Sequence, residues 1–221
     1  MMAAAASWLV DATRKMFYLV TPTELALDDS DLEPKWLLKQ GIPAFFLMIA
    51  AEAIFTRVVM GKGVYRLHEL LTCISLGSFQ LIGQAAFALL FQLVGLSAST
   101  SAYRWVWEHC RLFTIDSKSN VMLCYVCLLL GKDFGYYWAH RAMHEFHVLW
   151  VGHSVHHSGE DYHLGTALRQ GIGQAFVWPF YAPLAVLGFH PHAFAAHSQL
   201  NTLYMFWIHS MERAGPRTRS P

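Results

Sequence analysis

Histidine is the residue type whose number and spacing most suggest chemistry in this sequence. Seven of the thirteen histidines fall between His140 and His163. His140 and His144 stand four residues apart, so on a helix their side chains lie on one face, which Asp133 and Tyr137 share. We therefore expect His140 and His144 to converge on a single metal ion.

A second histidine group follows in the sequence HSVHH. His153, His156 and His157 have the spacing i, i+3 and i+4, which gathers three imidazoles on one helical face. Neutral imidazole binds iron, zinc, copper and nickel, so the ligand type leaves the metal open. The alternative is a structural cluster in which each ring finds a hydrogen bond, but so many ionisable rings beside apolar segments would be costly.

Carboxylates accompany the histidines. Asp133, seven residues before His140, is placed either to accept a hydrogen bond from an imidazole N–H or to act as a ligand. The run from His144 to His147 begins like the HExxH motif of zinc proteases, but position 148 is valine, so the second ligand is missing and proteolysis is not predicted.

The elements that must position these residues are apolar helices. With 55% hydrophobic and 14% charged residues, the 221-residue chain has too few charges to cover a soluble domain of its size. A formal net charge of +1 does not favour a nucleic acid partner. Five segments are candidate membrane elements, namely 42–60, 70–96, 121–130, 171–189 and 193–208.

The pattern of these segments predicts an all-α, multi-pass transmembrane protein with its histidine boxes at the cytosolic ends of helices. The segment 70–96 carries no charge and is the clearest span. Pro179 and Pro183 would kink 171–189 or turn it into a re-entrant hairpin. We expect a polar lead-in over 1–41, a membrane-embedded domain over 42–209 and a polar, basic tail over 210–221.

Three stretches are similar to the fatty acid hydroxylase superfamily. They are DFGYYWAHRAMHE at 133–145, WVGHSVHHSGEDYHLGTALRQ at 150–170 and QLNTLYMFWIH at 199–209. Within the superfamily they most resemble the alkylglycerol monooxygenases. The resemblance runs from about residue 14 to residue 209.

This resemblance implies a non-haem iron enzyme of the endoplasmic reticulum membrane. It would use O2 and tetrahydrobiopterin to hydroxylate the ether-bearing carbon of alkylglycerols, which then release a fatty aldehyde and a glycerol derivative. By the same resemblance the iron ligands are His140, His144, His153, His156 and His157. Glu145 is then a functional acid beside the metal, and we expect Asp133 to support catalysis with it.

One departure from the superfamily affects the expected activity. Members carry another HxxHH box beyond the position where this sequence ends, and the residues after His209, SMERAGPRTRSP, are unlike the sequences of those members. We therefore expect a C-terminally truncated form with little or no activity alone, although His197 or His209 could approach the metal. The alternatives are a sterol or fatty acyl hydroxylase, a non-catalytic isoform that pairs with a full-length copy, and a histidine-lined metal transporter.

Overall fold

The structure, a computed structural model, describes residues 2–17, 19–25, 36–61, 63–93, 100–116 and 119–210. These residues form helices and loops without any strand, which confirms the all-α class for the described part of the chain. The α-helices are α1 (Met2–Met16), α2 (Pro22–Leu25), α3 (Trp36–Val58), α4 (Leu67–Leu93), α5 (Thr100–Cys110), α6 (Val121–Glu145), α7 (His147–His153), α8 (Ala182–Val186) and α9 (Pro191–Trp207). Three 3-10 helices, η1 (His156–Ser158), η2 (Leu164–Leu168) and η3 (Ile172–Tyr181), lie between α7 and α8.

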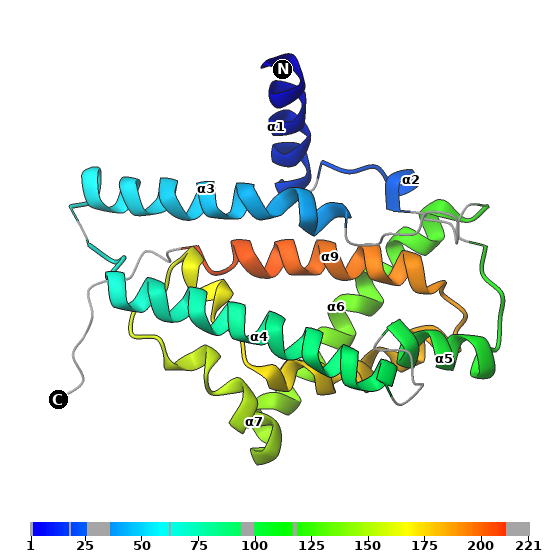
Figure 1. The fold of residues 1–221 in the computed structure, drawn as a ribbon. Coiled ribbons are helices and arrows are strands. Elements are labelled where there is room, and N and C mark those ends of the chain that lie inside the picture. The colour runs from blue at the N-terminus through cyan, green and yellow to red at the C-terminus, as the bar shows by residue number, and fades with distance from the viewer. Residues whose placement is uncertain are drawn as a thin grey trace.

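Helix α9 forms the centre of the molecule, with α3 on one side of it and α4 on the other (Figure 1). Its residues belong to two hydrophobic clusters. Leu200, Leu203 and Phe206 pack with side chains of α1, α3 and η2, while Ala193 packs with side chains of α5, α6 and α8. Both clusters therefore depend on α9, which also carries the chain toward the histidine boxes.

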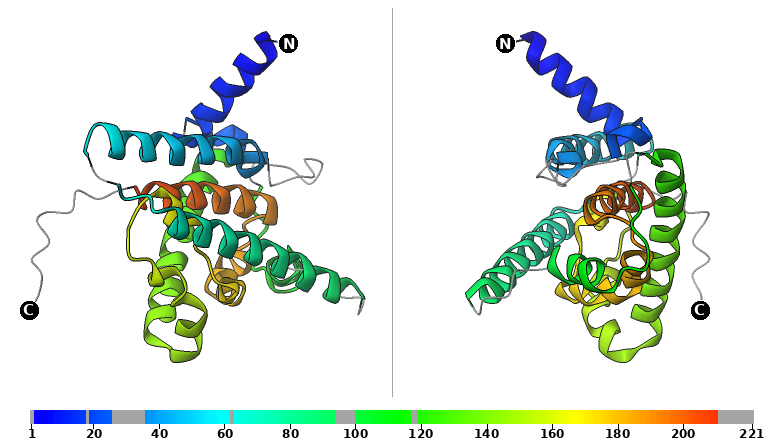
Figure 2. Two further views of the ribbon diagram at one scale, coloured as in Figure 1. Left: turned by 60° about the vertical axis from the view of Figure 1, so that its left-hand side comes forward. Right: turned by 90° about the vertical axis from the view of Figure 1, so that its right-hand side faces the viewer.

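Helix α6 runs along one side of the molecule and leads into α7 at its far end (Figure 2). Two glycines allow other elements to pack closely against it. A Cβ atom on Gly131 would lie 2.6 Å from Cδ2 of Leu184, and one on Gly135 would lie 2.8 Å from Cδ1 of Tyr181. Because these glycines are four residues apart, they share one face of α6, and η3 and α8 pack there.

The segment expected as a polar lead-in contributes to the core. Helix α1 projects from the molecule (Figure 1), but Ala12 and Met16 near its end are buried. The indole N–H of Trp207 donates a hydrogen bond of 2.7 Å to the carbonyl oxygen of Met16. Residues 26–35 of the lead-in and 211–221 of the expected tail lie outside the described residues.

The helices differ in part from the expected membrane elements. Helices α3 and α4 overlap the segments 42–60 and 70–96, although 94–96 lie outside the described residues. The segment 171–189 is a 3-10 helix followed by a short α-helix, which fits the missing N–H of Pro179 and Pro183. By length and hydropathy, none of the helices in the described residues qualifies as a membrane-crossing segment.

Candidate metal centre

The two histidine boxes meet where α6 turns into α7. The first box holds His140 and His144, and the second holds His153, His156 and His157. His140 and His144 lie on the last two turns of α6, and Phe146 then adopts extended backbone geometry that separates the two helices. His153 is the last residue of α7, and His157 follows it in η1. The turn at Phe146 lets α7 fold back against α6, so that both boxes face each other.

Four imidazoles converge through their Nε2 atoms. The Nε2 atom of His140 lies 3.0 Å from that of His144 and 3.2 Å from that of His153, and the Nε2 atoms of His153 and His157 are 3.0 Å apart. The ligand atoms of all four residues lie within 4.8 Å of one another. Two nitrogens at right angles around an ion with bonds of ~2.1 Å lie ~3.0 Å apart, so one ion fits among these atoms.

Burial favours the uncharged form of three of these rings, His140, His153 and His157, and the uncharged imidazole is the form that binds metals. Desolvation, followed by the neighbouring histidines, lowers the pKa of His140 to about 4 and that of His153 to about 3. Desolvation also lowers the pKa of His157. The buried Nδ1 of His153 has no hydrogen-bond partner among the described residues. Uncharged imidazoles with converging Nε2 atoms are a donor set that suits a transition metal.

A tyrosine orients the first histidine. The Nδ1 atom of His140 lies 3.1 Å from the hydroxyl oxygen of Tyr136, one turn earlier on α6. Asp133, which we expected in this position, is exposed. Seven helical residues correspond to ~10.5 Å along the axis, so Asp133 shares a face with His140 but stands two turns away. Tyr136, and not Asp133, is therefore the residue that contacts the Nδ1 atom of His140.

His156 and His209 form a pair beside the four-histidine cluster. Their Nε2 atoms are 3.1 Å apart, and the ring of His156 lies 5.4 Å from that of His153. The Nδ1 of His156 lies 2.9 Å from the carbonyl oxygen of Arg169, and that of His209 contacts the carbonyl of Met205. Such contacts fix the tautomer that leaves Nε2 free for a metal.

The structure also shows where the other candidate residues lie. Glu145 is exposed and forms an ion pair with Arg141, with 2.7 Å between Oε1 and Nε, and its assigned role stays a prediction. His197 is buried against the ring of Tyr125 and lies outside the cluster, so of the two later histidines only His209 reaches the site. His209 has no distinguishing spacing in the sequence, and its only signal was its place in the third family-like stretch, at the end of an apolar segment.

Two features hold the second box in place. A Cβ atom on Gly171 would lie only 1.9 Å from the carbonyl oxygen of Gly152, the residue before His153. The buried side chain of Arg169 donates from Nη1 to Oε2 of Glu69 on α4 at 2.7 Å. Its Nε donates to the carbonyl of Val155 at 3.2 Å, so the second box is tied to α4.

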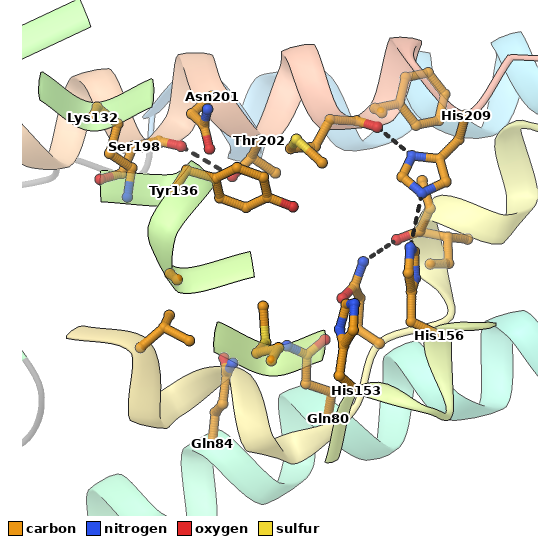
Figure 3. Close-up of a pocket in the computed structure, with 18 of the residues that line it drawn as sticks. Gln80, Gln84, Lys132, Tyr136, His153, His156, Ser198, Asn201, Thr202 and His209 are labelled. Atoms are coloured by element: carbon orange, nitrogen blue, oxygen red, sulfur yellow. Dashed lines mark hydrogen bonds between the residues drawn. The ribbon is translucent and has the colours of Figure 1, made fainter. Parts of the chain in front are cut away.

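A cavity of about 440 Å³ adjoins the histidines on the inner side of the molecule. His153, His156 and His209 lie at one end of it, and Lys132 lies at the other (Figure 3). Gln80 and Gln84 of α4 face Asn201 and Thr202 of α9 across the space (Figure 3). The cavity is thus a compartment with the candidate metal centre at one end and the buried Lys132 side chain at the other.

Known proteins share these sequence features. The family model described as Fatty acid hydroxylase matches residues 125–220, which include both boxes and His209. This chain belongs to the fatty acid hydroxylase superfamily. Alkylglycerol monooxygenase of Homo sapiens is 37% identical over 198 residues, and that of Xenopus tropicalis is 38% identical over 200 residues.

These matches cover most of this chain but less than half of each relative. Each covers 89% of this chain but 42% of the relative, so the chain spans about two fifths of the length of these curated relatives. No solved structure matches the chain significantly. Fatty acid hydroxylases are enzymes of the non-haem iron type, and the converging imidazoles of the four-histidine cluster fit such an ion.

Proposed function

We propose that this chain forms the iron-binding part of a monooxygenase that cleaves ether lipids. Its substrate would be an alkylglycerol, hydroxylated at the carbon next to the ether oxygen. In this reaction one oxygen atom of O2 would enter the C–H bond and the other would leave as water, with two electrons taken from tetrahydrobiopterin. The resulting hemiacetal breaks at its C–O bond to give a fatty aldehyde and a free glycerol hydroxyl. The observation that carries the proposal is the convergence of four Nε2 atoms in a family of hydroxylases.

The residues of this chain have binding and positioning roles in the proposal. Iron, when bound, would supply the oxygen activation that side chains cannot perform. His140, His144, His153 and His157 would hold it, and Tyr136 would fix the ring of His140. His156 and His209 would add ligands next to this set. The adjoining cavity would hold the substrate beside the iron and keep bulk water away.

A membrane location, with the endoplasmic reticulum as the expected one, also belongs to the proposal. Large apolar side chains on the outer faces of α3 and α4 are more than half exposed, among them Ile54, Phe55, Leu81 and Ile82. So many large exposed apolar side chains along these two helices favour a membrane or protein interaction site. An ether lipid would then reach the cavity from the bilayer without crossing water.

Metal content and lipid turnover test the proposal together. The purified chain is loaded anaerobically with Fe(II), and bound iron is measured by plasma mass spectrometry. With O2 and reduced pterin, aldehyde release from an alkylglycerol, a sterol and a fatty acyl lipid is then followed for this chain and for the human relative, of which the chain covers 42%. His153→Ala should remove the iron, whereas His147→Ala, at an exposed position two residues after Glu145 and outside the cluster, should retain it.

Three outcomes decide between the candidate functions. Iron that is held by the chain, lost in His153→Ala and needed for aldehyde release from the alkylglycerol would support the proposal. Iron-dependent oxidation of only the sterol or the acyl lipid would move the chain to another branch of the superfamily. A chain that binds no iron would contradict the proposed metal centre.

A further inference from the structure

Lys132 is a buried amine for which the proposed metal chemistry has no role. It lies on α6, and its residue is only 8% exposed. Its Nζ lies 3.4 Å from the centroid of the Tyr181 ring and 4.9 Å from that of Phe194. No carboxylate among the described residues forms an ion pair with it. Two ring faces therefore surround an amine that lacks a counter-ion within the described part of the chain.

Burial makes this amine more reactive than an ordinary lysine. Desolvation lowers the pKa of Lys132 to about 7. At pH 7 about half of these amines are then uncharged, whereas an exposed lysine with a pKa of about 10.4 is almost entirely protonated. The uncharged amine carries the free electron pair that attacks a carbonyl carbon. Burial in an apolar pocket is one way in which proteins activate the lysines that form imines.

One face of α6 connects this amine with the candidate metal centre. Lys132, Tyr136, Ala139 and Met143 follow one another at helical spacing, and all four line the cavity of about 440 Å³. Eight helical residues separate Lys132 from His140, which corresponds to ~12 Å along the axis. Lys132 lies at the end of the cavity opposite to the histidines (Figure 3). A molecule formed beside the histidines therefore reaches Lys132 through the cavity, without leaving the protein.

The lining of the cavity suits a molecule with an alkyl chain and one carbonyl group. Much of the wall is apolar, with side chains from several elements that include Phe45, Leu168, Val177 and Phe206. The described residues that line the cavity include no other lysine, no cysteine and no carboxylate. Lys132 is therefore the one primary amine that a carbonyl compound meets on this described wall.

We propose that Lys132 forms an imine with the fatty aldehyde that the cleaved ether lipid releases. This inference rests on the proposed function, because that reaction supplies the aldehyde. The electron pair of Nζ attacks the carbonyl carbon, and the carbonyl oxygen then leaves as water with the two protons of the amine nitrogen. One C=N bond replaces the C=O bond, so no oxidant or reductant takes part. Because water reverses the step, Lys132 holds the reactive product until hydrolysis releases it.

Reductive trapping on the intact chain in detergent micelles tests this assignment without any metal. The probes are dodecanal and propanal, each added with sodium cyanoborohydride, which reduces an imine to a stable secondary amine. Peptide mass spectrometry then locates the alkyl groups. Dodecanal should label Lys132 at a concentration about tenfold or more below that needed for Lys15, since far more of the Lys132 amine is uncharged at pH 7. Propanal has the same carbonyl group without the long chain, so it should lose most of this preference.

Two lysine variants and a competitor separate this site from general lysine chemistry. At limiting dodecanal the intact mass of the wild-type chain should rise by one alkyl group, and Lys132→Met should lose this addition. Lys15→Met, which removes the buried lysine that pairs with Asp11 outside the cavity, should keep it. Dodecanol has the same chain without a carbonyl group, so it should slow the labelling of Lys132 and form no adduct. If Lys132→Met does not fold, the peptide map of the wild-type chain decides by itself.

Labelling of Lys132 that is no stronger than that of Lys15 would overturn the inference. Equal preference for Lys132 with dodecanal and propanal would overturn it too, because the cavity would then not select an alkyl chain. Its failure is distinct from failure of the proposed function. Iron-dependent aldehyde release without an adduct at Lys132 rejects the inference and leaves the function intact. An adduct at Lys132 in a chain that binds no iron supports the aldehyde site and removes only the proposed source of the aldehyde.

Discussion

The side chains around the four-histidine cluster should differ in how much their removal weakens metal binding. Tyr136 belongs to both the candidate metal centre and the cavity, because its hydroxyl contacts Nδ1 of His140 and its side chain also lines the cavity. We expect Tyr136→Phe to keep the fold and to weaken metal binding about 10- to 100-fold, as removal of a group that orients a ligand does. Competition with a chromophoric chelator measures this change.

The neighbouring tyrosine provides the control for this substitution. Tyr137 is exposed, and its hydroxyl oxygen lies 3.4 Å from Nη1 of Arg141, away from the cluster. Tyr137→Phe should leave the metal affinity unchanged. Equal affinities in both variants would show that the Tyr136 hydroxyl does not orient His140.

His209 and His197 lie on or just after the same helix, but only His209 reaches the candidate centre. We expect His209→Ala to lower the amount of bound metal, because the Nε2 of His156 loses the partner 3.1 Å away. His197→Ala should leave the metal content as it is. Metal per chain, measured by plasma mass spectrometry on both variants, checks the difference, and equal values would exclude His209 from the ligand set.

Two glutamates form ion pairs at very different depths. The pair between Glu69 and Arg169 is almost completely buried, whereas that between Glu145 and Arg141 is about half exposed. Glu69→Gln should lower the free energy of unfolding by about 3–5 kcal/mol, since it leaves a buried charge alone. Glu145→Gln should change it by less than about 1 kcal/mol. Denaturant unfolding of both variants measures the contrast, and equal losses would contradict it.

The same glutamate variant tests the role that the family resemblance gives to Glu145. If this carboxylate acts in catalysis, Glu145→Gln in a turnover-competent relative should reduce aldehyde release at normal protein level. The same expectation holds for Asp133→Asn. Unchanged turnover in both variants would exclude a catalytic role for these two exposed carboxylates.

At the scale of elements, the close approach of α7 and the segment before η3 fixes the second histidine box. A Cβ atom on Gly171 would meet the carbonyl oxygen of Gly152 at 1.9 Å, so Gly171→Ala must push the backbone of α7 away. We expect this variant to lose bound metal and to unfold at lower temperature, because His153 moves with Gly152. Differential scanning fluorimetry and metal analysis measure the two effects.

Gly63→Ala is the matched control, because an added Cβ there meets only the end of the Arg57 side chain, which can move aside. This variant should retain both metal and stability. If Gly171→Ala behaves in the same way, the contact between the backbones does not position the box.

At the scale of the whole molecule, the exposed apolar faces of α3 and α4 predict tight membrane association. The chain expressed in cells should remain in the membrane pellet after extraction with alkaline carbonate. Leu81→Glu combined with Ile82→Glu should release a large part of it, since carboxylates on a lipid-facing surface are costly. The exchange of Leu81→Ile and Ile82→Leu keeps the apolar surface and should change nothing. Complete extraction of the unmodified chain would contradict membrane embedding.

The sequence by itself determined the helical class and the local histidine pairs. Helical periodicity places residues four apart on one face, so the contact between His140 and His144 followed from spacing alone. The same reasoning brought His153 and His157 together, because a chain near the helical conformation keeps such neighbours close. It misplaced Asp133, since a shared face says nothing about the distance along the helix.

Only the tertiary structure decided which distant residues meet. His156 faces His209 across 53 positions of sequence, because the chain leaves the α-helix after His153 and α9 later brings His209 to the site. The burial of Lys132 likewise depends on Tyr181 and Phe194, which arrive from later elements. Spacing encodes contacts within one helix, whereas contacts between helices depend on how their surfaces pack, and no local pattern specifies that packing.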